Sequence, residues 1–400
     1  MKPLRPSEPL RVAILGSTGS IGRSTLEVIR RHPERFEIVA LAAHRSLADV
    51  AEQVRAFRPR RAVVADASAL SPGADLPEAR WEGGRDALLA LASDPDVDIV
   101  VNALVGAVGL EPTLAALEAG KRLALANKES LVAGGPLVLE AARRGGGEIV
   151  PIDSEHSAIL QCIAGSDSAS VARIVLTASG GPFRGWNSDA LAGVRPADAL
   201  RHPTWEMGAK VTVDSATLAN KALEVIEAHF LYGVPYSAID VVVHPQSIVH
   251  SFVEFVDGSV LAQMGFPTME LPILYALSHP VRVEDGRLRT FDPVRSSPLT
   301  FEAVDRELFP LFDLGVSAGR QGGTAPAVFN AANEVAVEAF LKEQVSFRAM
   351  RTVVEAVLVE HEPGPVREVG DVLEADRSAR VSAGRAVERA AARTATGARA

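Results

Sequence analysis

Residues 12–22, VAILGSTGSIG, decide the fold of the first part of the chain. Four apolar residues predict a short strand buried on both faces, and glycines 16, 19 and 22 lead into a helix expected over 21–31. Such glycines let the backbone approach a diphosphate, whose charge is stabilised by amides at the helix N-terminus. Any tight strand-to-helix turn could use them, but their place after a first strand favours a dinucleotide site.

The same alternation of apolar strand and helix continues to about residue 150. Further strands are expected at 38–42, 62–64, 99–101 and 123–126, with helices at 47–57 and 111–119. Short strands buried on both faces, each followed by a helix, indicate an α/β fold with a parallel sheet. We therefore predict a Rossmann-like, doubly wound domain over 1–150.

Beyond residue 150 the pattern changes twice. Longer strands at 173–178, 241–243, 248–255 and 260–264, mixed with helices, predict an α+β domain over 151–285. A stretch rich in Arg, Asp, Pro and Ser then predicts a linker over 286–305. Residues 306–400 are expected to form a C-terminal helical bundle, clearest at 325–342 and 347–360. The last fifteen residues have little apolar face, which favours a frayed tail.

Composition excludes several classes of partner. There are 41 Lys and Arg against 50 Asp and Glu, a formal net charge of −9, which disfavours general affinity for nucleic acid or a membrane surface. The single cysteine, Cys162, excludes an intrachain disulfide and is expected to be a small buried apolar residue. With no signal peptide and no long uncharged apolar run, we expect a cytoplasmic protein.

The second expected strand ends at 42–46, close to where a dinucleotide-binding domain meets the adenosine ribose. No Asp or Glu stands there, whereas Arg45 could pair with a 2′-phosphate. The segment therefore favours NADP over NAD. The alternative is an arginine that is simply solvated in a loop.

Asp153 and Glu155 lie two residues apart and face one way if the chain is extended there. Adjacent carboxylates repel unless a proton or cation lies between them, and hard divalent cations prefer such oxygen ligands. The alternative is structural. Asp153 or Ser154 could cap the helix that follows, with Glu155 favourable in its first turn.

A helix is expected over 214–227, and its polar face carries Asn220, Lys221 and Glu224. Taken alone, a lysine and a glutamate three residues apart indicate a solvated salt bridge. Only other parts of the site could give this pair a different function.

Two further segments have polar or aromatic residues in unusual places. At 177–182 a strand end runs into a Gly-Gly turn, where amides and the Ser179 hydroxyl could hold an oxyanion. An ordinary turn is the alternative. At 202–208 a Pro- and Gly-bounded loop contains His202, Trp205 and Met207, which indicates either a lid that closes on a ligand or a loop pinned to the core.

Eight segments together resemble a known family. They are 16–22 (GSTGSIG), 126–130 (ANKES), 151–156 (PIDSEH), 177–183 (TASGGPF), 202–208 (HPTWEMG), 213–224 (VDSATLANKALE), 244–251 (HPQSIVHS) and 330–334 (NAANE). In this order they resemble the 1-deoxy-D-xylulose 5-phosphate reductoisomerases, over nearly the whole chain. The resemblance implies a homodimeric oxidoreductase and isomerase of the non-mevalonate isoprenoid pathway, which uses NADPH and one Mg²⁺ or Mn²⁺ per subunit.

The resemblance also implies roles for individual residues. The implied metal ligands are Asp153, Glu155 and Glu224. The implied catalytic residues are Lys128, Asp153, Glu155, His202 and Glu224. The implied substrate contacts are Lys128, Ser154, Glu155, Ser179, His202, Trp205, Ser215, Asn220, Lys221 and Glu224, with the phosphate on Ser179, Ser215, Asn220 and Lys221. The implied NADPH contacts are Ser17, Thr18, Gly19, Ser20, Ile21, Arg45, Asn127, Glu129, Met207 and Gly208.

The chain departs from the family pattern at three places. Ala222 stands where glycine is common, and residues 43–46 replace a more usual adenosine contact, which weakens the assignment of Arg45. Thr268 and Glu270 stand where Asp and Arg are frequent, so no role is carried over to them.

Two alternatives compete with the implied reaction. A semialdehyde-type dehydrogenase has a similar nucleotide loop but needs a cysteine nucleophile, and Cys162 lies in an apolar helical run that suits this poorly. The second alternative is not an enzyme but a binding protein that senses a nucleotide without turnover. It requires that the acidic and phosphate-binding positions have no catalytic role.

Overall fold

The computed structural model describes residues 8–70 and 75–397, and the chain divides into two compact units. Unit 1 contains Met1–Ser130, Pro136–Ser157 and Thr268–Arg289. Unit 2 contains Leu131–Gly135, Ala158–Pro267 and Thr290–Ala400. The four predicted segments, 1–150, 151–285, 286–305 and 306–400, remain a prediction, because this division recognises only two units.

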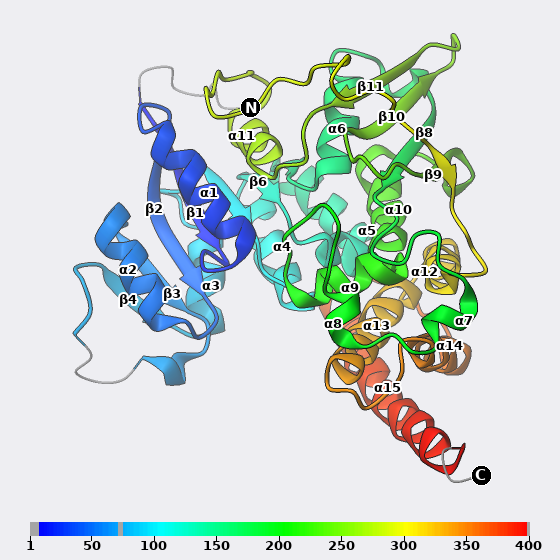
Figure 1. The fold of residues 1–400 in the computed structure, drawn as a ribbon. Coiled ribbons are helices and arrows are strands. Elements are labelled where there is room, and N and C mark those ends of the chain that lie inside the picture. Colours follow the sequence, from blue (N-terminus) through cyan, green and yellow to red (C-terminus); the bar gives the residue numbers. More distant parts are fainter. Residues whose placement is uncertain (1–7, 71–74, 398–400) are drawn as a thin grey trace. The chain divides into compact units, whose positions relative to one another are not determined.

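Unit 1 is built on a parallel sheet of seven strands (Figure 1, blue to cyan), in the order β4-β3-β2-β1-β5-β6-β7. The strands are β1 (Leu10–Leu15), β2 (Phe36–Ala43), β3 (Arg61–Val64), β4 (Arg80–Gly83), β5 (Ile99–Asn102), β6 (Arg122–Leu125) and β7 (Glu148–Pro151). The side chains of β1 from Val12 to Leu15 are fully buried, as expected for a strand covered on both faces. The predicted doubly wound fold is confirmed.

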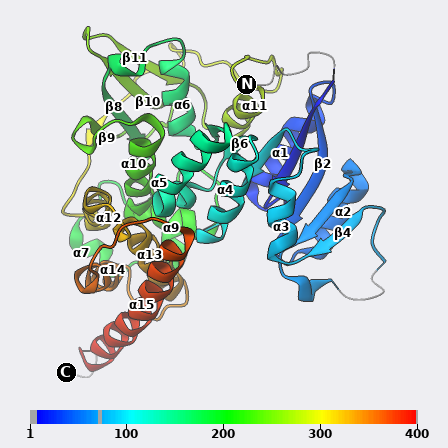
Figure 2. The same cartoon turned by 180° about the vertical axis from the view of Figure 1, so that it is seen from behind.

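Helices cover both faces of this sheet. Helices α1 (Ser20–Arg31) and α2 (Leu47–Phe57) lie over one face (Figure 1), and α3 (Arg85–Ala92) and α4 (Leu110–Glu118) lie over the other (Figure 2). The strand order reverses between β1 and β5, and open α/β sheets bind their ligands at the carboxyl ends of the strands at such a point. The loop 16–19 therefore begins at the expected place for a nucleotide.

A late segment of the chain also belongs to unit 1. Helix α11 (Glu270–Ser278) packs against α1 and against β6 and β7. Arg31 at the end of α1 pairs with Glu270 at 2.8 Å and with Asp285 at 2.7 Å. The segment predicted to end the second domain thus returns to the first sheet.

Unit 2 contains a mixed sheet of five strands in the order β11-β10-β8-β9-β12. The strands are β8 (Val171–Ala178), β9 (Ile239–Val243), β10 (Val249–Phe255), β11 (Val260–Met264) and β12 (Glu302–Ala303). Strands β8 and β9 are parallel, and the other pairs are antiparallel. This agrees with the α+β prediction and leaves β11 at an edge.

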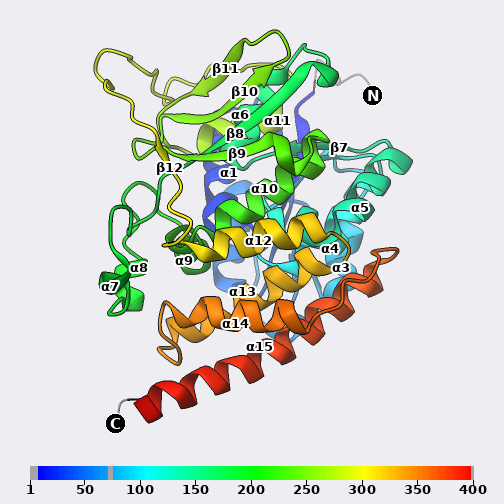
Figure 3. The ribbon, with the colours of Figure 1, turned by 90° about the vertical axis from the view of Figure 1, so that its right-hand side faces the viewer.

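The helices of unit 2 form most of its core. They are α9 (Ala209–Thr217), α10 (Ala219–Tyr232), α12 (Pro310–Gln321), α13 (Ala325–Leu341), α14 (Ala349–Glu360) and α15 (Val369–Gly397), with short α7 (Ser188–Leu191) and α8 (Pro196–Ala199). Helix α13 contacts both α14 and α15 (Figure 3). Phe329 and Phe340 on α13 are fully buried. Helices α5 (Lys128–Gly145) and α6 (Ser154–Ile163) have residues in both units.

The C-terminal helix differs from the sequence-based expectation. Helix α15 continues through Gly397, where a frayed tail was predicted from 386 onward; residues 398–400 lie outside the described part. Ala383, Ala386 and Val387 are buried in the core of unit 2. A narrow apolar stripe and the high helix propensity of alanine are therefore enough to continue α15 here. Among the described residues, no helix has the length and apolarity needed to cross a membrane.

Candidate active site

The loop after β1 has the geometry of a nucleotide-binding turn. Gly16 has φ +86°, and a Cβ there would lie 2.4 Å from the carbonyl oxygen of Ala103, so only glycine fits. Gly19 is the N-cap of α1 and makes no side-chain cap bond. The first amides of α1 are therefore not capped by a side chain and suit an anion.

The predicted NADPH contacts in this loop surround that helix start. Ser17 is buried, and its amide donates to Ala42 at 2.9 Å, whereas Gly19 and Ser20 are exposed and Thr18 and Ile21 are half-buried. Gln53 on α2 donates to the carbonyl of Ser17 at 3.0 Å. Sequence analysis missed Gln53 because no local pattern links it to the loop.

Arg45 follows the end of β2 and is two-thirds exposed, but it does not stand alone. Its Nε lies 2.8 Å from Asp66 Oδ2, at the end of β3. Bonds from the hydroxyl and amide of Ser68 lower the pKa of Asp66, and the Arg45 charge adds to this. Residues 42–46 contain no acidic residue, but Asp66, which follows the next strand, lies beside Arg45. The spacing in the sequence did not indicate this contact.

Asn127 and Glu129 have structural bonds in addition to their predicted cofactor role. The Asn127 amide donates to the carbonyls of Leu104 and Gly106, at 2.9 and 3.0 Å, and its Oδ1 accepts from the Ser130 amide at 3.1 Å. It also donates to Glu129 at 3.1 Å. Asn127 therefore caps α5 and holds the loop after β5.

The carboxylates of unit 1 stand at the start of α6. Asp153 Oδ1 accepts from the Glu155 amide at 3.2 Å, which is the capping role considered above, and its Oδ2 pairs with Lys128 Nζ at 2.7 Å. Ser154 donates to Glu155 Oε2 at 2.7 Å. Asp153 and Lys128 are only about a tenth exposed. Asp153 caps α6 with Oδ1 and pairs with Lys128 through Oδ2, so capping is not the only role open to this residue.

In unit 2 the polar face of α10 is buried at Lys221 and Glu224 and half-buried at Asn220. Glu224 is 1% exposed and Lys221 5%, and their side chains form an ion pair, while Asn220 donates to Glu224 Oε1. The solvated salt bridge considered from the sequence is therefore wrong. A buried ion pair is costly to desolvate, which favours a functional reason for its presence.

His202 joins the two predicted phosphate-binding serines. Its Nε2 lies 3.0 Å from Ser179 Oγ and 3.1 Å from Ser215 Oγ. Gly181, at φ +66°, lets the turn approach α9 so closely that a Cβ would lie 2.8 Å from the Ser215 carbonyl oxygen. Residues 179, 202 and 215, far apart in sequence, thus form one polar cluster.

The hydrogen bonds of His202 determine its protonation state. Its Nδ1 accepts from the amides of Thr204 and Trp205, at 3.1 and 2.9 Å, so the proton of the neutral ring lies on Nε2 and can be donated to a serine oxygen. Burial lowers the pKa of His202 to about 4. In the absence of ligand, the ring is neutral near pH 7.

Trp205 and Met207 of the predicted lid are half-buried. The Trp205 ring lies 6.4 Å from that of His250 on β10, between ring centroids, whereas Met207 is half-buried and Gly208 exposed. Gly208 is the N-cap of α9. His250, which sequence analysis did not single out, is the aromatic support of this loop.

Cys162 lies on α6, is 8% exposed and belongs to the apolar core of unit 2. Burial among aliphatic side chains disfavours a thiolate. The cysteine-dependent alternative therefore lacks a suitable nucleophile at this position.

Comparison with known proteins identifies the family. The model described as 1-deoxy-D-xylulose 5-phosphate reductoisomerase matches residues 12–135, and models of its C-terminal domains match 149–232 and 264–382. The chain belongs to the 1-deoxy-D-xylulose 5-phosphate reductoisomerase family. The reductoisomerase of Symbiobacterium thermophilum is 52% identical over 381 residues, covering 93% of this chain and 97% of that relative.

Solved structures of the family agree. The Zymomonas mobilis reductoisomerase, in complex with NADPH, gives a TM-score of 0.88 at 41% identity and covers 95% of this chain and 100% of that chain. Another reductoisomerase, in complex with NADPH, fosmidomycin and magnesium, gives 0.89 at 38% identity, with coverage of 95% and 98%. These matches confirm the fold class and the resemblance.

The half-buried, neutral His202 predicts a loss of stability in mild acid. Because its pKa is about 4 in the folded chain and about 6.5 unfolded, the unfolded state binds more protons between these values. The free energy of unfolding should fall by roughly 1–2 kcal/mol as the pH drops from 7 to 4, since solvent screens part of the effect. His202→Asn keeps an acceptor near the Nδ1 position and should lose this pH-dependent part of the free energy of unfolding, as measured by urea titrations. If the free energy of unfolding depended on pH equally in both proteins, His202 would not be the group responsible.

Arg45 predicts the choice of cofactor. Arg45→Ala should lower kcat/KM for NADPH about 10-fold, the value of one charge-assisted contact at an exposed site, and leave that for NADH nearly unchanged. Asp66→Asn is the matched control, because it removes the ion-pair partner but keeps the arginine. Equal losses with both cofactors in Arg45→Ala would show that Arg45 does not contact the 2′-phosphate.

Proposed function

We propose that this chain catalyses the rearrangement and NADPH-dependent reduction of 1-deoxy-D-xylulose 5-phosphate to 2-C-methyl-D-erythritol 4-phosphate, a step of the non-mevalonate isoprenoid pathway. The observation that carries the proposal is the family match over residues 12–135, 149–232 and 264–382. All the carboxylates, lysines and serines that this chemistry needs lie in the matched ranges.

Asp153, Glu155 and Glu224 are the proposed ligands of one Mg²⁺ or Mn²⁺. Their donor set fits, because hard divalent cations prefer carboxylate oxygens, and magnesium is present in the solved relatives. When bound, the cation supplies Lewis-acid stabilisation of the substrate's adjacent carbonyl and hydroxyl oxygens. Lys128 and Lys221 form ion pairs with Asp153 and Glu224, so each of these carboxylates has a positive neighbour in the fold.

Ser179, Ser215, Asn220 and Lys221 are the proposed phosphate ligands. The cluster of His202 with Ser179 and Ser215 supports this, because two hydroxyls and an Nε2–H are donors suited to a phosphate oxygen. Fosmidomycin in a solved relative is consistent with an anionic ligand. Burial of the Lys221 ammonium adds charge where water cannot screen it.

Lys128 and Ser154 are proposed to contact the reacting part of the substrate. The Lys128 ammonium, held by Asp153 at 2.7 Å, can stabilise oxyanion charge or move a proton at a substrate oxygen. The Ser154 hydroxyl, now donated to Glu155, can be redirected to the substrate. Both residues act from fixed positions at helix starts, so little reorganisation is needed.

NADPH is proposed to bind at the loop of unit 1, and it supplies the hydride. Its proposed contacts are Ser17, Thr18, Gly19, Ser20, Ile21, Arg45, Asn127, Glu129, Met207 and Gly208. Support comes from the uncapped start of α1 and from the NADPH complexes of the relatives. His202, Trp205 and Met207 are proposed to close as a lid, which excludes water during the reaction.

A cytoplasmic homodimer is the proposed form of the enzyme. The edge strand β11 exposes Val260 (54%), Leu261 (48%) and Met264 (36%). Apolar residues on an unpaired edge strand favour association with a second copy. Sedimentation velocity should give a dimer, and Leu261→Lys should shift it toward monomer.

The reaction predicts metal-dependent NADPH oxidation. NADPH absorbance should fall when 1-deoxy-D-xylulose 5-phosphate and Mg²⁺ or Mn²⁺ are both present. The Asp153→Asn, Glu224→Gln double variant should lose about 100-fold or more in kcat while binding NADPH normally, because charge stabilisation is removed and the nucleotide loop is untouched. Absence of turnover by folded, NADPH-binding wild type with either metal would reject the reaction and favour a nucleotide sensor.

A further inference from the structure

Helix α9 is tied to the C-terminal helix α13 by a buried polar bond. Asn333 Nδ2 on α13 donates to Asp214 Oδ1 on α9 at 2.7 Å, across 119 residues of chain. Both residues are completely buried. A buried hydrogen bond to a charged group is stronger than a neutral one and fixes geometry as well as energy.

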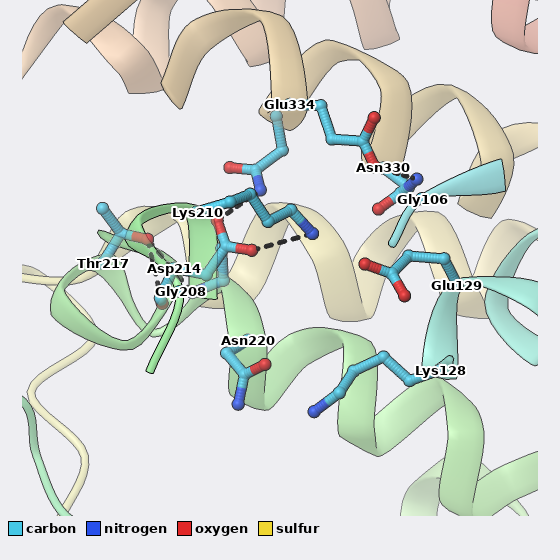
Figure 4. A network of polar contacts seen from close by, with 12 residues as sticks. Gly106, Lys128, Glu129, Gly208, Lys210, Asp214, Thr217, Asn220, Asn330 and Glu334 are labelled. Carbon is cyan, nitrogen blue, oxygen red and sulfur yellow. Dashed lines mark hydrogen bonds and ion pairs between the residues drawn. The ribbon is translucent and has the colours of Figure 1, made fainter. Parts of the chain in front are cut away.

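The second oxygen of Asp214 is also occupied. Lys210 Nζ lies 3.0 Å from Asp214 Oδ2, one turn earlier on α9, as the dashed line in Figure 4 marks. Lys210 is two residues beyond Gly208, where the proposed lid ends and α9 begins. One carboxylate thus binds the first turn of α9 and the neighbouring helix at once.

The next residue after Asp214 is Ser215 of the phosphate site. Its hydroxyl lies 3.1 Å from His202, and its carbonyl packs on Gly181 with no room for a Cβ. The Asp214 carbonyl accepts from Thr217 Oγ1 at 3.2 Å, and Thr217 Oγ1 accepts from the Ala219 amide at 3.3 Å. A shift of Asp214 would therefore move Ser215 and the start of α10 together.

We propose that Asp214 and Asn333 are positioning residues of the phosphate site. Through their bond, α13 of the C-terminal bundle sets where Ser215 and the start of α10 meet the substrate. Neither residue touches the substrate; each acts through α9. The inference rests on the proposed function, since it names what holds that site in place.

Asn330 provides a matched control on the same helix. It is 1% exposed, like Asn333, but its amide donates to Glu334 on its own helix at 3.1 Å. Glu334 in turn pairs with Arg380 on α15 at 2.6 Å. Loss of Asn330 should therefore destabilise the bundle without releasing α9.

The test compares Asn333→Ala with Asn330→Ala. Asn333→Ala should raise KM for 1-deoxy-D-xylulose 5-phosphate, and its Kd by calorimetry, about 10-fold, because small displacements of binding groups weaken affinity. KM for NADPH should stay unchanged. Asn330→Ala should lower Tm to a similar extent and leave both KM values as in wild type.

A charge swap separates positioning from simple stability. Asn333→Asp keeps the volume but places two carboxylates together, so KM for the substrate should rise further. Adding Asp214→Asn restores one donor and one acceptor and should return KM to within about threefold of wild type. The swap also serves if Asn333→Ala does not fold.

Two results would overturn the proposal. One is a lowered Tm in Asn333→Ala with unchanged substrate KM and Kd; the other is an equal rise of KM in Asn330→Ala. Failure of the proposed function is distinguishable, because wild type itself would then neither turn over nor bind 1-deoxy-D-xylulose 5-phosphate.

Discussion

Pairing of buried carboxylates with lysines is the interaction on which both units depend. Asp153 with Lys128, Glu224 with Lys221 and Asp214 with Lys210 are each close ion pairs with little exposure. An unpaired buried carboxylate is strongly destabilising, so acid-rich helices could not pack here without these ammonium groups. Each pair places a positive group beside the carboxylate, which offsets part of the cost of burying that carboxylate.

Local sequence pattern was sufficient for most of the fold. The predicted strands of the parallel sheet contain continuous apolar runs, and α2 at Leu47–Phe57 and β11 at Val260–Met264 have the predicted bounds. The edge strand β4 (Arg80–Gly83) has no such run and was not predicted. Periodicity works in these places because burial of each element is set by its own residues. It failed at the C-terminus, where Ala386 and Val387 are buried although the surrounding sequence has few large apolar side chains.

Contacts between distant residues could not be predicted in this way. Nothing near Arg31 indicates that Glu270 and Asp285 return to it, and nothing near Arg45 indicates Asp66. The local chemistry of α10 even favoured a solvated pair, because the spacing of Lys221 and Glu224 does not report burial. Only the family resemblance joined the carboxylates and serines into one site, by the order of eight segments.

The junction of α9 and α10 shows how strain and packing are balanced at the proposed phosphate site. Leu218 ends one helix and begins the next with φ +58°, a left-handed conformation that costs about 1 kcal/mol for a residue with a side chain. Glycine would relieve this strain, but Leu218 is 2% exposed and contributes to the apolar core. The free energy gained by burying the Leu218 side chain offsets the cost of its left-handed backbone conformation. The sharp turn therefore persists and brings Ser215, on the last turn of α9, to the same junction as Asn220 and Lys221, on the first turn of α10.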